Sequence, residues 1–187
     1  MSVIKVNTIQ NANGTTGITF AANGQMTLAN TPLQLTGGQI AFPGTQIASS
    51  DGNTLDDYEE GTFSPTIASG FSTAPSSYAT QRGAYRKIGS YVYFQIQIDA
   101  TGTVADGSGL QIGGLPFTAA SASSVAHGGA FLNYGNSFDT NAGDTFHILN
   151  SSTTIGVYNN AGSNRAGNSA GVTINNEFLL CGFYITA

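Results

Sequence analysis

The fold class is decided by residues 85–98, which read Tyr85-Arg86-Lys87-Ile88-Gly89-Ser90-Tyr91-Val92-Tyr93-Phe94-Gln95-Ile96-Gln97-Ile98. A Gly-Ser turn is followed by strict alternation, and side chains two residues apart on a strand point to the same face. One face therefore holds Val92, Phe94, Ile96 and Ile98, and the other holds Tyr91, Tyr93, Gln95 and Gln97. This pattern predicts an antiparallel strand with one face in a core, and we expect the two tyrosines to line an interface between copies of the chain.

Shorter apolar runs on both sides of this stretch predict further strands, separated by turns rich in Gly and Asn. The expected strands are residues 62–67, 110–112, 130–134, 145–149, 154–158, 171–174 and 178–186. No segment of ten or more residues has helical spacing with caps. The sequence therefore predicts an all-β protein in which residues 61–187 form an antiparallel β-sandwich, or jelly-roll-like, knob domain.

The region before residue 50 repeats a small unit, an apolar-x-apolar triplet followed by a few small or polar residues. The repeated apolar positions are Ile18 and Phe20, Met26 and Leu28, Leu33 and Leu35, and Ile40 and Phe42. Each triplet presents two apolar side chains to one face of an extended segment. A strip of this kind cannot enclose its own apolar face, so we expect residues 17–50 to form a repetitive β stem that pairs with identical copies.

Two further segments flank this stem. Residues 1–16 begin with an alternation around Val3 to Thr8 that suits a strand added to a sheet of another protein, so we expect an anchoring segment there. Residues 51–60 contain five acidic side chains and are expected to be a solvated connector. The run Asp51-x-Asn53 is only faintly similar to a calcium loop, because the Gly and Glu at the required spacings are missing, so no metal is expected.

Charge limits the possible partners. Only 8% of the 187 residues are charged, against about 25% in an ordinary soluble domain, and the net charge is -5. Five scattered cations offer no face that could neutralise phosphates, which argues against nucleic acid. The sequence also has no apolar run of about 18 residues and no signal-peptide pattern, so membrane insertion is not expected. The single cysteine, Cys181, lies in an apolar run and is expected to be buried.

Three motifs, occurring in order, resemble the C-terminal domain of bacteriophage tail fibres and related virion appendages. They are Leu55-Asp56-Asp57-Tyr58-Glu59-Glu60-Gly61-Thr62-Phe63-Ser64-Pro65-Thr66-Ile67, Gly83-Ala84-Tyr85-Arg86-Lys87-Ile88-Gly89 and Ile112-Gly113-Gly114-Leu115-Pro116-Phe117-Thr118. The opening Val3-Ile4-Lys5-Val6-Asn7-Thr8-Ile9-Gln10-Asn11 is similar to the start of cyanophage-type fibre proteins. The resemblance implies an intertwined homotrimer in the virion, made in the host cytoplasm and joined to other tail or head proteins through its N-terminus.

The resemblance implies one of two functions. The chain is either a tail fibre that contributes to host recognition and attachment, or an architectural head fibre, decoration or tail adaptor without receptor binding. A polysaccharide-degrading tailspike is a third, less favoured alternative, because such enzymes use longer β-helices. The only histidines, His127 and His147, have no nucleophile elbow or paired metal spacing around them, so no catalytic residue and no cofactor is expected.

Host contact is expected on loops of the knob that combine aromatic and amide side chains, which suit the apolar face and the hydroxyls of a host glycan; a host protein is the alternative ligand. The candidate residues are Tyr134, Asn136, Asp139, Tyr158, Asn159, Asn160, Asn164 and Arg165. The alternative is a purely structural role, in which these Asn residues form turns and the Tyr residues cap the core.

Overall fold

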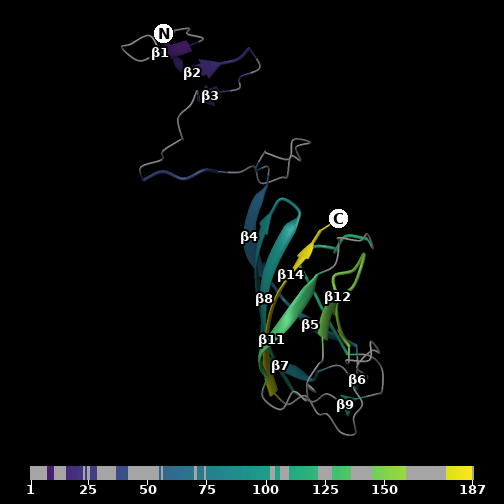
Figure 1. Cartoon of the computed structure of the whole chain (residues 1–187). Coiled ribbons are helices and arrows are strands. Elements are labelled where there is room, and N and C mark those ends of the chain that lie inside the picture. Colours follow the sequence, from purple (N-terminus) through teal and green to yellow (C-terminus); the bar gives the residue numbers. More distant parts are fainter. Residues whose placement is uncertain are drawn as a thin grey trace. The chain divides into compact units, whose positions relative to one another are not determined.

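The structure of the chain is a computed structural model. The structure describes residues 8–10, 16–22, 24, 26–28, 37–41, 55, 57–69, 71–73, 75–101, 104–105, 110–121, 128–135, 145–158 and 176–186. The chain divides into two compact units, residues 1–41 and residues 42–187 (Figure 1). All regular structure among the described residues is β, with antiparallel pairing throughout, which confirms the predicted fold class in its coarse form.

The first unit is a three-stranded sheet of β1 (Thr8–Gln10), β2 (Thr16–Phe20) and β3 (Met26–Leu28). The turn between β2 and β3 includes Gly24, whose φ of 83° favours glycine. In the register of this sheet Ile9 lies opposite Ile18, and Ile18 lies opposite Leu28, so the three residues form one row. The first two triplets of the repeat therefore pair with each other within the chain, although the repeat had suggested that only another copy could cover them.

The apolar row of this unit is incompletely covered. Ile18 and Leu28 are half-buried, whereas Ile9 and Met26 are exposed. A single layer of three short strands buries one face only against another surface, so the stem remains a prediction. Ile40 is exposed in a non-strand segment, contrary to the triplet pattern, and Leu33, Leu35 and Phe42 lie outside the described residues. Residues 8–10, expected in the anchoring segment, add a strand to the chain's own sheet.

The second unit is built on a nine-stranded sheet with the order β4-β7-β8-β14-β11-β12-β13-β10-β5. Its strands are β4 (Tyr58–Phe63), β5 (Thr66–Ser69), β7 (Ser77–Ile88), β8 (Tyr91–Thr101), β10 (Gln111–Gly113), β11 (Gly129–Gly135), β12 (Thr145–Ile148), β13 (Ile155–Tyr158) and β14 (Asn176–Ile185). A separate pair, β6 (Phe71–Thr73) and β9 (Val104–Ala105), completes the list.

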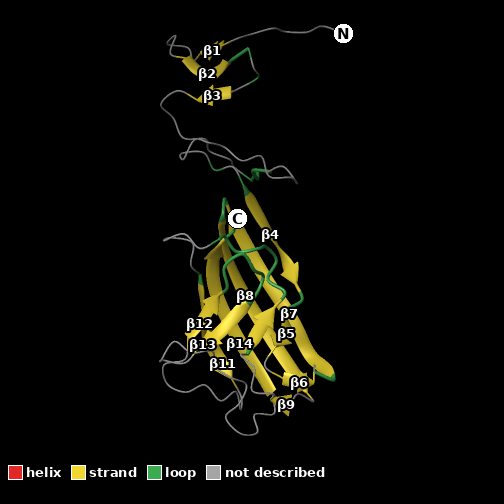
Figure 2. Cartoon of the chain, turned by 90° about the vertical axis from the view of Figure 1, so that its right-hand side faces the viewer, coloured by secondary structure: helices red, strands yellow, loops and turns green. Residues whose placement is uncertain are grey.

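This large sheet curls on itself. Its two edge strands, β4 and β5, are consecutive in the chain and are joined only by Ser64 and Pro65. Proline has no backbone N–H to donate, so strand pairing stops there and the chain turns from one edge to the other. In Figure 1, β4, β7 and β8 form one wall and β12 and β5 form the other; Figure 2 shows the same strands from the side. The single strand expected over residues 62–67 is therefore wrong, and two strands take its place.

The core fills the inside of the curl. Its fully buried side chains come from facing walls and include Val92, Phe94, Ile98, Ile112, Ile148, Ile155, Val157, Phe178, Leu180 and Tyr184. The alternation predicted for residues 91–98 is confirmed, and Gly89 makes the predicted turn with a φ of 56°. The expected strands at residues 110–112, 130–134, 145–149, 154–158 and 178–186 are confirmed within a few residues, whereas residues 171–174 are outside the described part.

The seam between the two edges is packed by the three motifs that resemble phage fibres. Lys87 forms a buried ion pair with Asp57, and the Lys87 ammonium lies 5.6 Å from the centre of the Phe117 ring. The Tyr85 ring meets the Phe117 ring edge-on at 5.2 Å. Residues far apart in sequence are thus held together at one point. Asp57 and residues 58–60 were expected in a solvated connector; instead Asp57 is buried and residues 58–60 begin β4.

Two glycines along this seam leave the space that aromatic rings occupy. A Cβ on Gly83 would lie 2.4 Å from the Phe63 ring, and one on Gly61 would lie 2.8 Å from the Tyr85 hydroxyl. In the β4–β7 register Gly61 is opposite Tyr85 and Phe63 is opposite Gly83. Each ring therefore covers the glycine across from it, and cross-strand pairs of this kind fix the register of a sheet.

Candidate functional site

The predicted host-contact residues fall mostly outside the described residues; these are Asn136, Asp139, Asn159, Asn160, Asn164 and Arg165. Tyr134 lies in β11 and is exposed, whereas Tyr158 ends β13 half-buried, with its ring edge-on to His147 at 5.9 Å. His147 therefore packs against an aromatic ring, and His127 is not described. The two described tyrosines lie on strands separated by β12, and the loop site remains a prediction.

A more extensive candidate surface lies on the outer face of the curled sheet, which we define as the face of β4, β7, β8, β14 and β11 opposite the core. Strand alternation places Tyr91, Tyr93, Gln95 and Gln97 of β8 on this face, as predicted. It places Cys181 there as well. The cysteine is half-buried and its Sγ donates to Asn133 Oδ1 at 3.3 Å, so the expectation of a core thiol is wrong. The adjacent Leu180 and Gly182 face inward instead.

The first part of the outer face is an aromatic patch, defined here as Tyr58, Ile88, Tyr91, Tyr93, Phe131 and Phe183. Cross-strand register joins five of its members: Tyr58 is opposite Ile88, Ile88 opposite Tyr91, and Tyr93 opposite Phe183. The sixth, Phe131, is opposite Cys181, two residues before Phe183 on β14. The Tyr91 and Phe183 rings stack at 5.7 Å with an interplanar angle of 15°. These side chains are between 38% and 64% exposed. The described part of the chain thus leaves a contiguous apolar surface uncovered.

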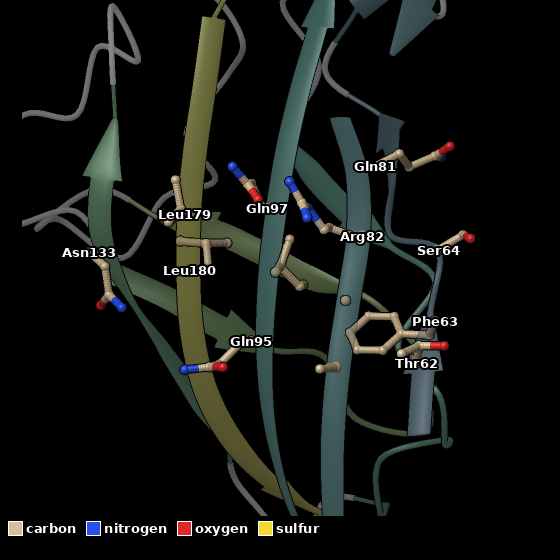
Figure 3. A pocket seen from close by; sticks show the side chains of 13 residues that line it. Thr62, Phe63, Ser64, Gln81, Arg82, Gln95, Gln97, Asn133, Leu179 and Leu180 are labelled. Carbon is tan, nitrogen blue, oxygen red and sulfur yellow. The ribbon is translucent and has the colours of Figure 1, made fainter. Parts of the chain in front are cut away.

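The second part of the outer face is an amide groove of about 660 Å³ next to the aromatic patch (Figure 3). Its outward side chains include three carboxamides, from Gln95, Gln97 and Asn133, and one guanidinium, from Arg82. In Figure 3 Arg82 extends from β7 toward Gln97 of β8, its register partner. Ala84 and Leu179 supply apolar surface between the polar groups. Pockets of 300–1,000 Å³ are the usual size for small-molecule ligands.

A second hollow of about 460 Å³ lies at the seam and is lined by Asp57, Glu59, Lys87 and residues 116–118, together with Thr186. The Tyr85 hydroxyl donates to Glu59 Oε1 beside it, and this hydrogen bond raises the pKa of Tyr85 to about 12. The Tyr184 hydroxyl donates to Phe117 O at 3.1 Å and accepts from Phe117 N at 3.2 Å. Burial raises the pKa of Tyr184 to about 12 as well. These polar groups satisfy one another, so we interpret the hollow as part of the seam.

Neither part of the outer face was assigned as a ligand site from sequence. Alternation identified the faces of β8, but the groove also needs Arg82, Asn133 and Leu179, which come from strands whose order the sequence does not give. Within the described residues there is no group of three or more His, Cys, Asp or Glu side chains placed to hold a metal ion. Nor does the described part contain a helix long and apolar enough to cross a membrane.

Comparison of the chain with protein-family models, with curated proteins and with solved structures finds no match. Function is therefore argued from the outer face itself.

Proposed function

We propose that this chain is a structural fibre subunit of a bacteriophage virion, which assembles as a homotrimer and contributes to attachment at the host surface without catalysing a reaction. Two lines of argument support the proposal. The first is the resemblance of three motifs to phage fibre domains. Those motifs meet at one seam, through Asp57, Lys87, Tyr85 and Phe117, so the matching residues are the ones that close the sheet.

The second line of argument is the exposed aromatic patch, which supports the proposal that the chain assembles with other copies. A large apolar side chain has a surface of roughly 200 Å², so the six exposed members of the patch present roughly 550 Å² of apolar surface to water. The largest apolar patch on a typical monomer is about 300–600 Å², and a standard interface buries about 800 Å² per partner. The patch is therefore at the upper end of the range for a monomer and large enough to supply the core of a standard interface, and the charged residues beside it, Glu60 and Arg86, have the position of a rim.

A second copy of the chain is the occupant that we favour, because the patch is aromatic and uncharged and the rim carries both signs. Glu60 and Arg86 lie 3.6 Å apart and are both well exposed, so each could pair with its counterpart on another copy. Around a three-fold axis Glu60 of one copy would meet Arg86 of the next, so a rim with both signs of charge suits an assembly of identical chains. The trimeric number comes from the resemblance to phage fibres.

Native mass spectrometry of the full chain tests this assembly. We expect a species of three chains, and we expect Tyr91→Ser combined with Phe183→Ser to raise the protein concentration at which it dissociates into monomers. Tyr134→Ser is the matched control, since Tyr134 is as exposed as Tyr91 but lies outside the aromatic patch. A monomeric parent protein at micromolar concentration, or a double variant that dissociates at the same concentration as the parent, would contradict the proposal.

The architectural alternative, a head fibre, decoration or tail adaptor, predicts the same trimer. Adsorption of the purified chain to host cells separates it from an attachment fibre, because only the fibre should bind them. The polysaccharide-degrading alternative predicts that purified protein shortens host polysaccharide, and we expect no loss of chain length.

A further inference from the structure

The amide groove has the chemistry of a saccharide site, and we propose that it binds a neutral oligosaccharide segment. This inference deepens the attachment role given under the proposed function. It names a site on the rigid sheet, distinct from the loop residues expected from sequence, and it names the class of ligand.

Hydrogen bonds within the protein hold the amide side chains of the groove in place. They still leave hydrogen-bond donors and acceptors of these amides available to a ligand. Gln95 Nε2 donates to the Tyr93 hydroxyl at 3.2 Å, Gln97 Nε2 donates to Glu177 Oε1, and Asn133 Oδ1 accepts from Cys181. Within the described part of the chain, this leaves the Oε1 atoms of Gln95 and Gln97 as acceptors and Asn133 Nδ2 as a donor. Sugar hydroxyls both donate and accept, so they match such a mixture. Amides already held in place also lose less conformational freedom on binding.

Charge around the groove favours a ligand without net charge. Arg82 is exposed and has no acidic partner within 4.0 Å among the described residues, so it opposes a cationic ligand. Asp99 and Glu177 lie opposite each other in the β8–β14 register, one step beyond Gln97 and Leu179, and they oppose a polyanion. The guanidinium still donates hydrogen bonds to hydroxyls, and its position opposite Gln97 aims it at the same ligand.

Apolar surface between the polar groups suits the C–H face of a sugar ring. Ala84 and Leu179 lie on either side of the row formed by Gln95 and Gln97, and the groove is lined by residues from β4 across to β11. Because the groove borders the aromatic patch, an interface over the patch would place the groove at its rim, where an extended chain of sugars can enter.

The test uses the full-length protein and saturation-transfer NMR with a panel of oligosaccharide probes. The neutral probes are maltohexaose, cellohexaose, laminarihexaose and chitohexaose, and the charged probes are oligogalacturonate and chitosan hexamer. We expect transfer to at least one neutral probe and weaker transfer to the charged ones. Arg82→Ala and Gln97→Ala should each raise the Kd of that probe by about tenfold, the loss that corresponds to one or two hydrogen bonds.

Arg86→Lys is the matched control, since Arg86 is also an exposed arginine on the outer face of β7 but does not line the groove, and lysine keeps the positive charge beside the aromatic patch. It should leave the Kd unchanged, and circular dichroism should show the same fold for all three variants. Transfer to none of the neutral probes, preference for a charged probe, or an unchanged Kd in both Arg82→Ala and Gln97→Ala would overturn the inference. Native mass spectrometry of the same samples reports assembly separately, so a trimer that binds no neutral sugar contradicts this inference alone.

Discussion

The buried ion pair between Lys87 and Asp57 should be the most sensitive polar contact of the curled sheet. The two side chains retain only 6% and 7% of their surface. Removing one partner leaves the other charge buried, which costs about 3–5 kcal/mol in such sites. A domain of this size has a free energy of unfolding of about 5–15 kcal/mol, so Asp57→Asn or Lys87→Met should remove at least about a fifth of it.

The stability of the double variant, compared with that of the two single variants, is the more discriminating test. Replacing both charges by neutral groups of similar shape leaves no buried ion, and such replacements are often neutral or stabilising. Asp57→Asn with Lys87→Met should therefore be clearly more stable than either single variant, with a coupling energy of at least about 2 kcal/mol. The methionine keeps a flexible apolar chain beside Phe117, but the contact of the ammonium with the ring, worth about 0.5–2 kcal/mol, is lost.

Urea denaturation followed by tyrosine fluorescence measures these free energies. The chain has 8 tyrosines and no tryptophan, and every tyrosine lies between residues 58 and 184, so the signal reports the second unit. Protein concentration must be equal for all variants because assembly adds to apparent stability.

Glu60 and Arg86 supply the control for this cycle. They join β4 to β7 on the outer face, with Arg86 next to Lys87 and Glu60 three residues after Asp57, and their side chains are 60% and 63% exposed. Exposed pairs contribute about 0–1 kcal/mol, so Glu60→Gln with Arg86→Met should change stability little. Because both residues also lie beside the aromatic patch, the comparison uses samples that native mass spectrometry shows to have the same assembly as the parent protein. Single variants at Asp57 and Lys87 that cost less than about 1 kcal/mol each, or effects that simply add, would refute the reasoning.

Two further predictions concern packing and pH. A Cβ on Gly182 would lie 2.4 Å from Gly129 O, which belongs to the backbone and cannot move aside. Gly182→Ala should therefore lower the free energy of unfolding, measured by urea denaturation, by about 3 kcal/mol. Gly129→Ala is the control and should lower it much less, because its Cβ would meet only Phe146 O at 3.5 Å. Because burial raises the pKa of Tyr184 from 10 to about 12, folding favours its protonated form; this contribution is complete below pH 10 and is lost as the pH rises toward 12. The free energy of unfolding should thus fall over that range, and less steeply in Tyr184→Phe; equal slopes in the two proteins would argue against this cause.

The sequence by itself determined the fold class and the inner face of β8. Strict alternation after a Gly-Ser turn is a local property of the sequence. Because side chains two residues apart on a strand point to the same face, it places Val92, Phe94, Ile96 and Ile98 in one buried row. The strands at residues 110–112, 145–149 and 178–186 followed from the same kind of signal. The N-terminal half of β7 did not, because its inward positions include Gln81 and Gly83. The Phe63 ring from β4 fills the space over Gly83, and Gln81 Nε2 donates to Pro65 O.

Tertiary structure alone decided which strands are neighbours, and with that the candidate sites. Alternation fixes the face on which a side chain lies, but it contains no information about the partner strand. Asp57 was therefore predicted to be solvated, although the curl brings it to Lys87, and Cys181 was predicted in the core, although register places it beside Asn133 on the outer face. The aromatic patch and the amide groove each combine residues more than eighty positions apart, because long-range pairing of β8 with β14 aligns their outward side chains.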